Sequence, residues 1–127
     1  MGATLNRTLQ SSVTKTAAFT GSWVGTGVIN KPISASIAGN MSATVIVDVS
    51  AITGAANFRL VGKDPVSGNT YDIPGGALPT ILEIGTKSIT IEGPFPAQVA
   101  LAVDPEEGTA GDAVESVTYT GSLQLWG

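Results

Sequence analysis

The stretch ATVIVDVSAI, residues 43–52, decides the fold class of this 127-residue chain. Val45, Val47 and Val49 occur at every second position, and alternate side chains of an extended chain point to the same face. β-Branched residues at this period fit a strand that is buried on one face, and they fit a helix poorly. The stretch therefore predicts a strand with one side in an apolar core.

The residues that follow predict a second strand. Thr53-Gly54-Ala55-Ala56 is typical of a turn, and the run NFRLVG, residues 57–62, then places Phe58 and Leu60 on one face and Arg59 on the other. Two alternating runs separated by a short turn favour a β-hairpin. We therefore expect the two strands to pair with each other.

A second corner follows in LVGKDPVSGNTYDIPGG, residues 60–76. Pro65 has no amide hydrogen, so the strand should stop near Asp64. Ser67-Gly68-Asn69 is strong turn chemistry because Gly and Asn tolerate positive φ. Tyr71 and Ile73 restart a short strand. We expect a hairpin corner in which the Asp64 carboxylate bonds to backbone amides.

The rest of the chain repeats this pattern. Further alternating runs end at turn residues, and they lie at 18–30, 33–37, 81–85, 87–93, 97–104 and 117–126. About eight or nine short strands without a helical period predict an all-β fold, either an antiparallel β-sandwich or a jelly-roll-like barrel. Residues 1–17 lack a clear period and predict an extended N-terminal arm, which leaves residues 18–127 for the sandwich domain.

The composition disfavours an enzyme. The chain has no histidine and no cysteine, so the usual general base and thiolate chemistry are missing. No nucleophile elbow or phosphate loop occurs, and we expect no catalytic residue and no cofactor. The carboxylate pairs Asp64 with Asp72 and Glu83 with Glu92 could in principle hydrolyse a glycoside, but they are more typical of solvent-facing strand and turn residues.

An acidic loop at 104–115 is the candidate metal site that the sequence offers. Asp104, Glu106, Glu107 and Asp112 are close in sequence, and calcium prefers oxygen ligands. Their spacing matches no EF-hand loop, so a solvated loop or an acidic docking patch is favoured. We predict no metal site, and the sequence leaves open whether this loop binds calcium.

The charge is unevenly distributed. The first 31 residues carry Arg7, Lys15 and Lys31 and no acid, a charge of +3, while the rest carries −7, which gives the net charge of −4. This front segment is either a solvated terminus or a basic arm that lies on an acidic neighbour. The sequence contains no basic cluster of the kind that binds nucleic acid, and no apolar run that is long enough to span a membrane. Because only 13% of the residues are charged, we also expect a homo-oligomer.

The aromatic residues are few and scattered. Trp23, Tyr71, Tyr119 and Trp126 favour core or subunit contacts over a sugar-stacking platform. Trp126 is the penultimate residue, and a tryptophan there either packs on its own fold or anchors a partner. The candidate interaction residues are thus Arg7, Lys15, Lys31, Trp23 and Trp126.

The segment VIVDVSAITGAANFRLVGKDPVSGNTYDI, residues 45–73, resembles a stretch of small structural proteins of tailed bacteriophages. The shared features are the Val-rich strand, the Thr53-Gly54 turn, the corner from Gly62 to Gly68, and the pair Tyr71-Asp72. The resemblance covers about 30 residues and implies a β-sandwich more directly than a role.

What the resemblance implies is a non-enzymatic virion protein. We expect a capsid decoration, or cement, protein that is made in the host cytoplasm and binds the major capsid protein on the outside of the phage head as a trimer. One alternative is a tail, baseplate or head-fibre protein. An alternative of another class is a glycan-binding β-sandwich module that uses Trp23, Tyr71 or Trp126.

Overall fold

The computed structural model describes residues 4–26, 42–64, 66–92, 95–96, 98–106 and 115–126. These residues form strands and no helix, so none of them belongs to a helix that could cross a membrane. The strands are β1 (Thr4–Lys15), β2 (Phe19–Thr20), β3 (Val24–Gly25), β4 (Ser42–Thr53), β5 (Ala55–Lys63), β6 (Thr70–Ala77), β7 (Gly85–Glu92), β8 (Gln98–Glu106) and β9 (Ser116–Trp126). The predicted all-β class is confirmed, while the predicted run 33–37 lies outside the described residues.

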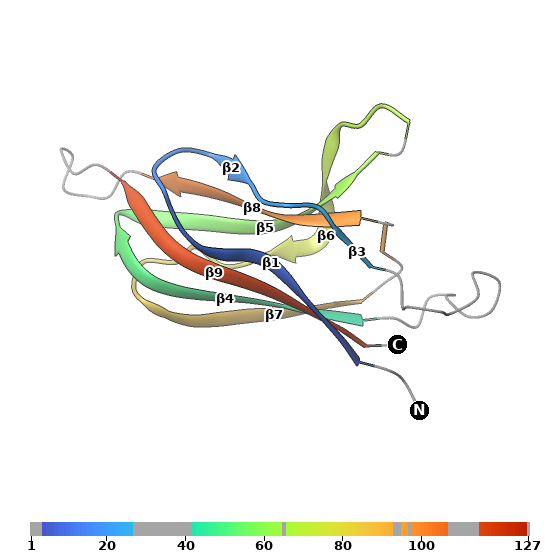
Figure 1. Cartoon of the computed structure of the whole chain (residues 1–127). Coiled ribbons are helices and arrows are strands. Elements are labelled where there is room, and N and C mark those ends of the chain that lie inside the picture. Colours follow the sequence, from blue (N-terminus) through green and yellow to red (C-terminus); the bar gives the residue numbers. More distant parts are fainter. Residues whose placement is uncertain are drawn as a thin grey trace.

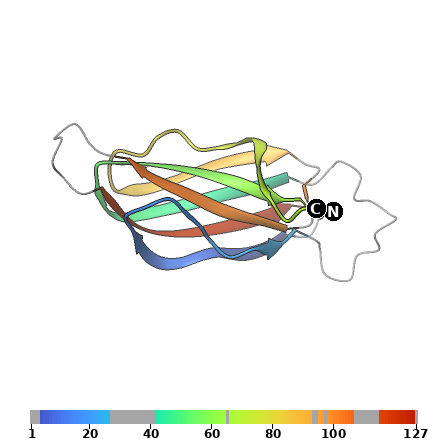
Figure 2. The ribbon, with the colours of Figure 1, turned by 90° about the horizontal axis from the view of Figure 1, so that it is seen from above.

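The strands form two antiparallel sheets that pack face to face (Figures 1 and 2). Sheet A has the order β1-β9-β4-β7. In sheet B, β2 and β3 pair one after the other with the same side of β8, which is followed by β5 and β6. The predicted antiparallel β-sandwich is therefore confirmed.

The order of pairing identifies the sandwich as a jelly roll. The strands pair from the chain ends inward: β1 with β9, β2 and β3 with β8, β4 with β7, and β5 with β6. These pairs alternate between the two sheets, so the chain wraps around the core as two Greek keys do. The sequence left two architectures open, the sandwich and the jelly-roll-like barrel. The structure is a double-sheet jelly roll, which has features of both.

The core lies between the inner faces of the two sheets. Val45, Val47 and Val49 of β4 are buried, as their alternation predicts. Phe58 of sheet B meets Tyr119 of sheet A with ring centroids 4.8 Å apart and planes at 72°, an edge-to-face contact. The other large side chains of the core are Leu9, Leu60, Val99, Leu101, Leu123 and Leu125.

The N-terminal segment is extended, but residues 4–15 do not form an arm separate from the body. They are β1, which pairs with β9 from Thr4↔Trp126 to Lys15↔Val117. Two register shifts interrupt this pairing, and Leu9 beside them is buried in the core. The polar residues of 1–17 hide this strand in the sequence, because an edge strand buries little of its surface. The boundary between arm and sandwich expected at residue 18 therefore does not separate two parts of the structure.

The expected hairpin between β4 and β5 is not formed. β4 pairs with β7 and β9 in sheet A, whereas β5 pairs with β6 and β8 in sheet B. Thr53 and Gly54, the latter with a φ of 83°, carry the chain from one sheet to the other. Alternation shows which face of a strand is apolar and not which strand lies beside it, and here the two apolar faces meet across the core.

Candidate interaction surfaces

The β5–β6 hairpin projects from the body of the sandwich, and a network around Asp64 closes its turn (Figure 1). The Asp64 Oδ1 accepts hydrogen bonds from the amides of Val66 at 2.8 Å and Ser67 at 3.4 Å. The Asp64 amide donates to the Asn69 carbonyl at 2.8 Å, and Gly68, with a φ of 78°, donates its amide to the Asp64 carbonyl at 2.8 Å. The predicted hairpin corner and its Asp64 cap are confirmed.

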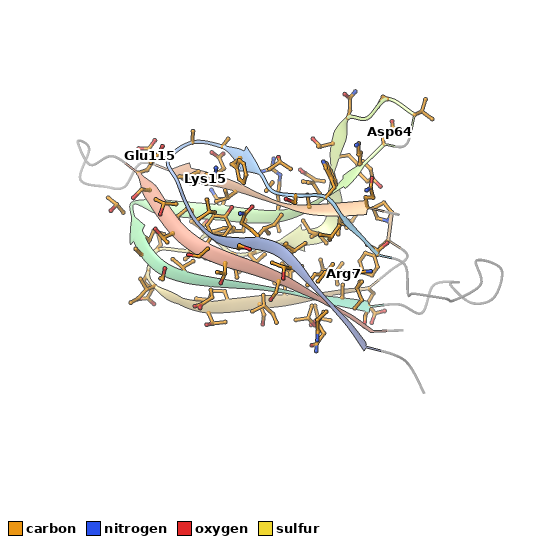
Figure 3. All side chains as sticks on the ribbon, in the orientation of Figure 1. Arg7, Lys15, Asp64 and Glu115 are labelled. Atoms are coloured by element: carbon orange, nitrogen blue, oxygen red, sulfur yellow. The ribbon has the colours of Figure 1, made fainter. Side chains whose placement is uncertain are left out.

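These contacts set the charge state of Asp64. The Val66 amide, followed by the hydroxyl and the amide of Ser67, lowers the pKa of Asp64 below its ordinary value of 3.8, because the bonds favour the ionised carboxylate. A carboxylate held by its own turn has a structural role. Asp64 lies in the projecting hairpin (Figure 3), and its fixed turn leaves Val66 almost completely exposed, at 94%.

The structure gives each of the two carboxylate pairs a different setting. Asp72 lies 2.9 Å from the Nε of Arg59, an exposed ion pair worth about 0–1 kcal/mol. Glu83 precedes the eight-residue strand β7 and Glu92 is its last residue, which keeps the two carboxylates more than about 20 Å apart. The carboxylates of glycosidases are separated by roughly 5–10 Å, so the geometry excludes the Glu83–Glu92 pair.

The acidic loop lies mainly outside the described residues. Asp104 is exposed on β8, Glu106 ends that strand, and Glu115 precedes β9. Within the described ranges, no group of three or more His, Cys, Asp or Glu residues could hold a metal ion. Glu107 and Asp112, which the calcium hypothesis requires, fall on residues 107–114 and are outside those ranges.

Trp23 covers part of the outer face of sheet B. Its ring packs against a small apolar cluster formed by Val61, Ala100 and Ala102, and the Lys63 Nζ lies 5.7 Å from the ring centroid. A cation–π contact at such a surface contributes about 0.5–1 kcal/mol. The local contacts of Trp23 are therefore accounted for by its own fold.

A shallow depression lies near Trp23 on the same face. It has a volume of about 170 Å³ and is lined by Ala18, Phe19, Thr20, Arg59, Ala102, Val103 and Asp104. The Lys15 Nζ lies 3.7 Å from the centroid of the Phe19 ring. The depression is smaller than the roughly 300–1,000 Å³ of typical small-molecule sites, so it fits one side chain or one sugar unit at most.

The structure does not gather the predicted interaction residues into one surface. Arg7 and Lys15 lie eight positions apart on β1, near opposite ends of the sandwich and on the order of 25 Å from each other (Figure 3). The Arg7 Nε is buried and has no hydrogen-bond partner among the described residues. Trp126 ends β9, where its backbone pairs with Thr4 and Ser42, and Lys31 lies outside the described residues.

The outer face of sheet A is a hydroxyl-rich surface that the sequence reasoning missed. Cross-strand bonds join Thr14 to Thr118 at 2.7 Å and Thr44 to Thr90 at 3.0 Å. The outward Ser and Thr residues are Thr8, Thr14, Ser42, Thr44, Ser50, Thr86, Ser88, Thr90, Ser116, Thr118, Thr120 and Ser122. In the sequence, Ser or Thr occurs at every second position of 86–90 and of 116–122. Only the strand order of sheet A places these two rows of hydroxyl side chains on one surface.

The function of such surfaces depends on the partners that they bind, and similarity to a characterised protein would indicate such a partner. Comparisons of the chain with protein-family models, with curated proteins and with solved structures gave no match.

Proposed function

We propose that the chain is a non-enzymatic structural protein of a tailed phage, and that it decorates the outer surface of the head. The observation that carries the proposal is the double-sheet jelly roll, an architecture found in viral coat and lectin domains. The phage-like segment 45–73 supplies most of β4, the corner to sheet B, β5 and the capped hairpin, so it occupies structural positions in that fold.

The surfaces support binding to a protein shell. Asp48 and Glu92 are the charged side chains on the outer face of sheet A among the described residues, so little charge has to be desolvated when this face is covered. The capped hairpin presents Val66 away from the body. A broad uncharged face and a fixed apolar tip can contact the major capsid protein without ordering a long segment.

Binding of this kind stabilises the shell by mass action. A ligand that binds the assembled lattice and not its separated subunits adds RT ln(1 + [L]/Kd) per site, about 2.7 kcal/mol at a free concentration of a hundred times Kd. Many such sites together oppose the internal pressure of packaged DNA.

The test is co-sedimentation with empty heads prepared from the phage that encodes the chain, after deletion of its gene. We expect saturable binding with a fixed number of copies per head, and heads that open at a higher temperature when the protein is added. Heads that bind no protein at concentrations well above micromolar contradict the proposal. Labelling that places the protein on tails or fibres instead supports the alternative virion role.

A glycan-binding module is the second candidate. The observation that favours it is the depression on sheet B, which is lined by Phe19, Arg59 and Asp104 and which shares Ala102 with the cluster under Trp23. It ranks second because lysine amines already contact both aromatic rings. A glycan array with the intact protein and with Trp23→Ala tests it, since binding that the substitution abolishes supports the module.

A further inference from the structure

A sandwich exposes the edge strands of its sheets, and three of the four edges described here carry features that hinder pairing with another chain. β1 has two register shifts against β9. β6 has a register shift against β5, next to which Pro74 removes an amide donor. β2 and β3 are two-residue strands. Bulges, prolines and short strands are the usual devices by which proteins protect sheet edges.

β7 is different. It pairs with β4 through eight consecutive residue pairs, from Ser42↔Glu92 to Val49↔Gly85, without a register shift. It contains no proline, and none of the described strands pairs with its other side. Its backbone therefore presents a regular row of amide and carbonyl groups along the open side of sheet A.

The side chains of β7 are complementary to those of a second β7. The inward row contains Ile89, which is partly exposed, and Ile91, which is buried, while Ser88, Thr90 and Glu92 point outward. If two copies pair antiparallel about a two-fold axis at Thr90, Ile89 lies opposite Ile91 twice and Ser88 lies opposite Glu92 twice. Apolar side chains then meet each other, hydroxyl donors meet carboxylate acceptors, and no like charges are opposed.

Lys87 restricts the register. It belongs to the inward row, and shifting the axis to Ile89 or Ser88 would place its ammonium group opposite Ile91 or Ile89. An ammonium group against an apolar partner is unfavourable because it loses water without gaining a hydrogen bond. With the axis at Thr90, Lys87 lies beyond the five-residue ladder of Ser88–Glu92 and stays in solvent.

A second observation points to the same surface. Leu82 and Ile84, which immediately precede β7, are 71% and 63% exposed. Exposed large apolar side chains next to each other mark contact surfaces. An antiparallel partner places its own Leu82–Ile84 segment beyond Glu92 of the first copy, so both ends of the ladder gain apolar cover.

We propose that β7 is a self-association edge. Two copies pair through Ser88–Glu92 about a two-fold axis at Thr90, and the two four-stranded sheets A become one continuous eight-stranded sheet. The occupant is a second copy because the strand is complementary to itself in both rows. This inference is independent of the proposed role on a phage head, but its two-fold pair differs from the trimer that the resemblance implies.

Cross-linking gives the sharpest test because the chain has no cysteine. Opposed residues of an antiparallel pair have Cα atoms about 4.5–5.5 Å apart, which is within the range of a disulfide. We expect Thr90→Cys in the full-length chain to form a disulfide dimer rapidly under mild oxidation. The matched control, Thr8→Cys on the β1 edge of the same sheet, should remain mainly monomeric in the same assay.

Sedimentation velocity supplies a second readout. The unmodified protein should show a concentration-dependent monomer–dimer equilibrium, and Thr90→Lys, which opposes two ammonium groups at the axis, should weaken it at least about tenfold. Circular dichroism and the melting temperature establish that Thr90→Lys is folded. If that variant does not fold, the cysteine pair alone decides.

Three outcomes overturn the proposal: a monomer at all concentrations together with no cross-link at residue 90, a trimer, or a dimer that neither cross-links at residue 90 nor responds to Thr90→Lys. Equal cross-linking at residues 8 and 90 also counts against it, since it indicates random collision. A dimer that cross-links selectively at residue 90 supports it.

Discussion

Gly121 of sheet A and Leu101 of sheet B approach each other across the core so closely that a Cβ on Gly121 would lie 2.5 Å from the Leu101 Cδ2. Real Cβ atoms do not come this close to another carbon, so the leucine occupies the space that a side chain at position 121 would need. The next nearest neighbour is the Leu9 Cβ at 3.6 Å. Interiors are close-packed, so this contact fixes the spacing of the two sheets at that point.

Gly121→Ala should therefore destabilise the fold. Overpacking of a well-packed core costs about 1–3 kcal/mol, and we expect a loss of that size in the free energy of unfolding by urea. Ser122→Ala, a substitution at the adjacent outward position, is the control and should change stability by less than about 0.5 kcal/mol. In a background of Leu101→Ala, which removes the opposing methyl groups, the cost of Gly121→Ala should largely disappear. A full cost in both backgrounds would show that the two residues are not coupled.

Asp64 should make the stability of the protein depend on pH. The pKa of Asp64 is lower in the folded state than in the unfolded state, so the charged cap stabilises the fold above about pH 3.8. This contribution to stability is lost as the pH falls through the folded-state pKa. Asp64→Ala should thus be less stable than the unmodified protein near about pH 7, and the difference should shrink near about pH 3. Urea denaturation at both pH values measures it. Val66→Ala at the same turn should have an effect that is independent of pH.

Tyr119 should ionise at a higher pH in the folded protein than an ordinary tyrosine does. Burial raises its pKa to about 12, so in Tyr71→Phe, where Tyr119 is the remaining tyrosine, the phenolate absorbance should appear near pH 12. The unfolded phenol ionises near 10, so stability present below that pH should fall between about 10 and about 12. A phenolate signal at pH 10 from folded protein would contradict the burial of this side chain.

Tyr119→Phe should cost little. The hydroxyl is buried and has no hydrogen-bond partner among the described residues, so its removal relieves a desolvation penalty that is typically about 1–3 kcal/mol. The edge-to-face contact with Phe58 is kept. We expect the melting temperature to stay the same or to rise. A loss of more than about 1 kcal/mol would indicate that the hydroxyl has a partner.

Lys15→Glu tests whether the basic residues of the front segment contact the shell. If Lys15 faces an acidic neighbour, the reversal should weaken binding to empty heads about tenfold at low salt, and the difference should fade as salt shortens the screening length below roughly 10 Å. Lys63→Glu on sheet B makes the same change in net charge and should leave the affinity unchanged. Equal effects of both variants would indicate a general charge effect and not a contact of Lys15.

The candidate sites were only partly predictable. The role of Asp64 followed from the sequence because its partners, Val66 and Ser67, lie two and three positions away. The cation–π partner of Trp23, Lys63, is 40 positions away, and nothing in the sequence pairs them. The hydroxyl face and the open edge of β7 also depend on which strands become neighbours, so they could not be predicted from local pattern.

By itself, the sequence determined that β4 is a strand and which of its faces is buried, because a period of two in Val45, Val47 and Val49 fixes the direction of each side chain relative to the core. It also determined the β5–β6 corner, where proline, glycine and a capping carboxylate act within a few residues. Only the tertiary structure decided that β4 and β5 lie in opposite sheets and that the polar β1 pairs with β9 at the other end of the chain. The hydrogen bonds between paired strands are made by backbone groups that every residue shares. Which strands become neighbours therefore depends on how all the apolar faces pack together in one core.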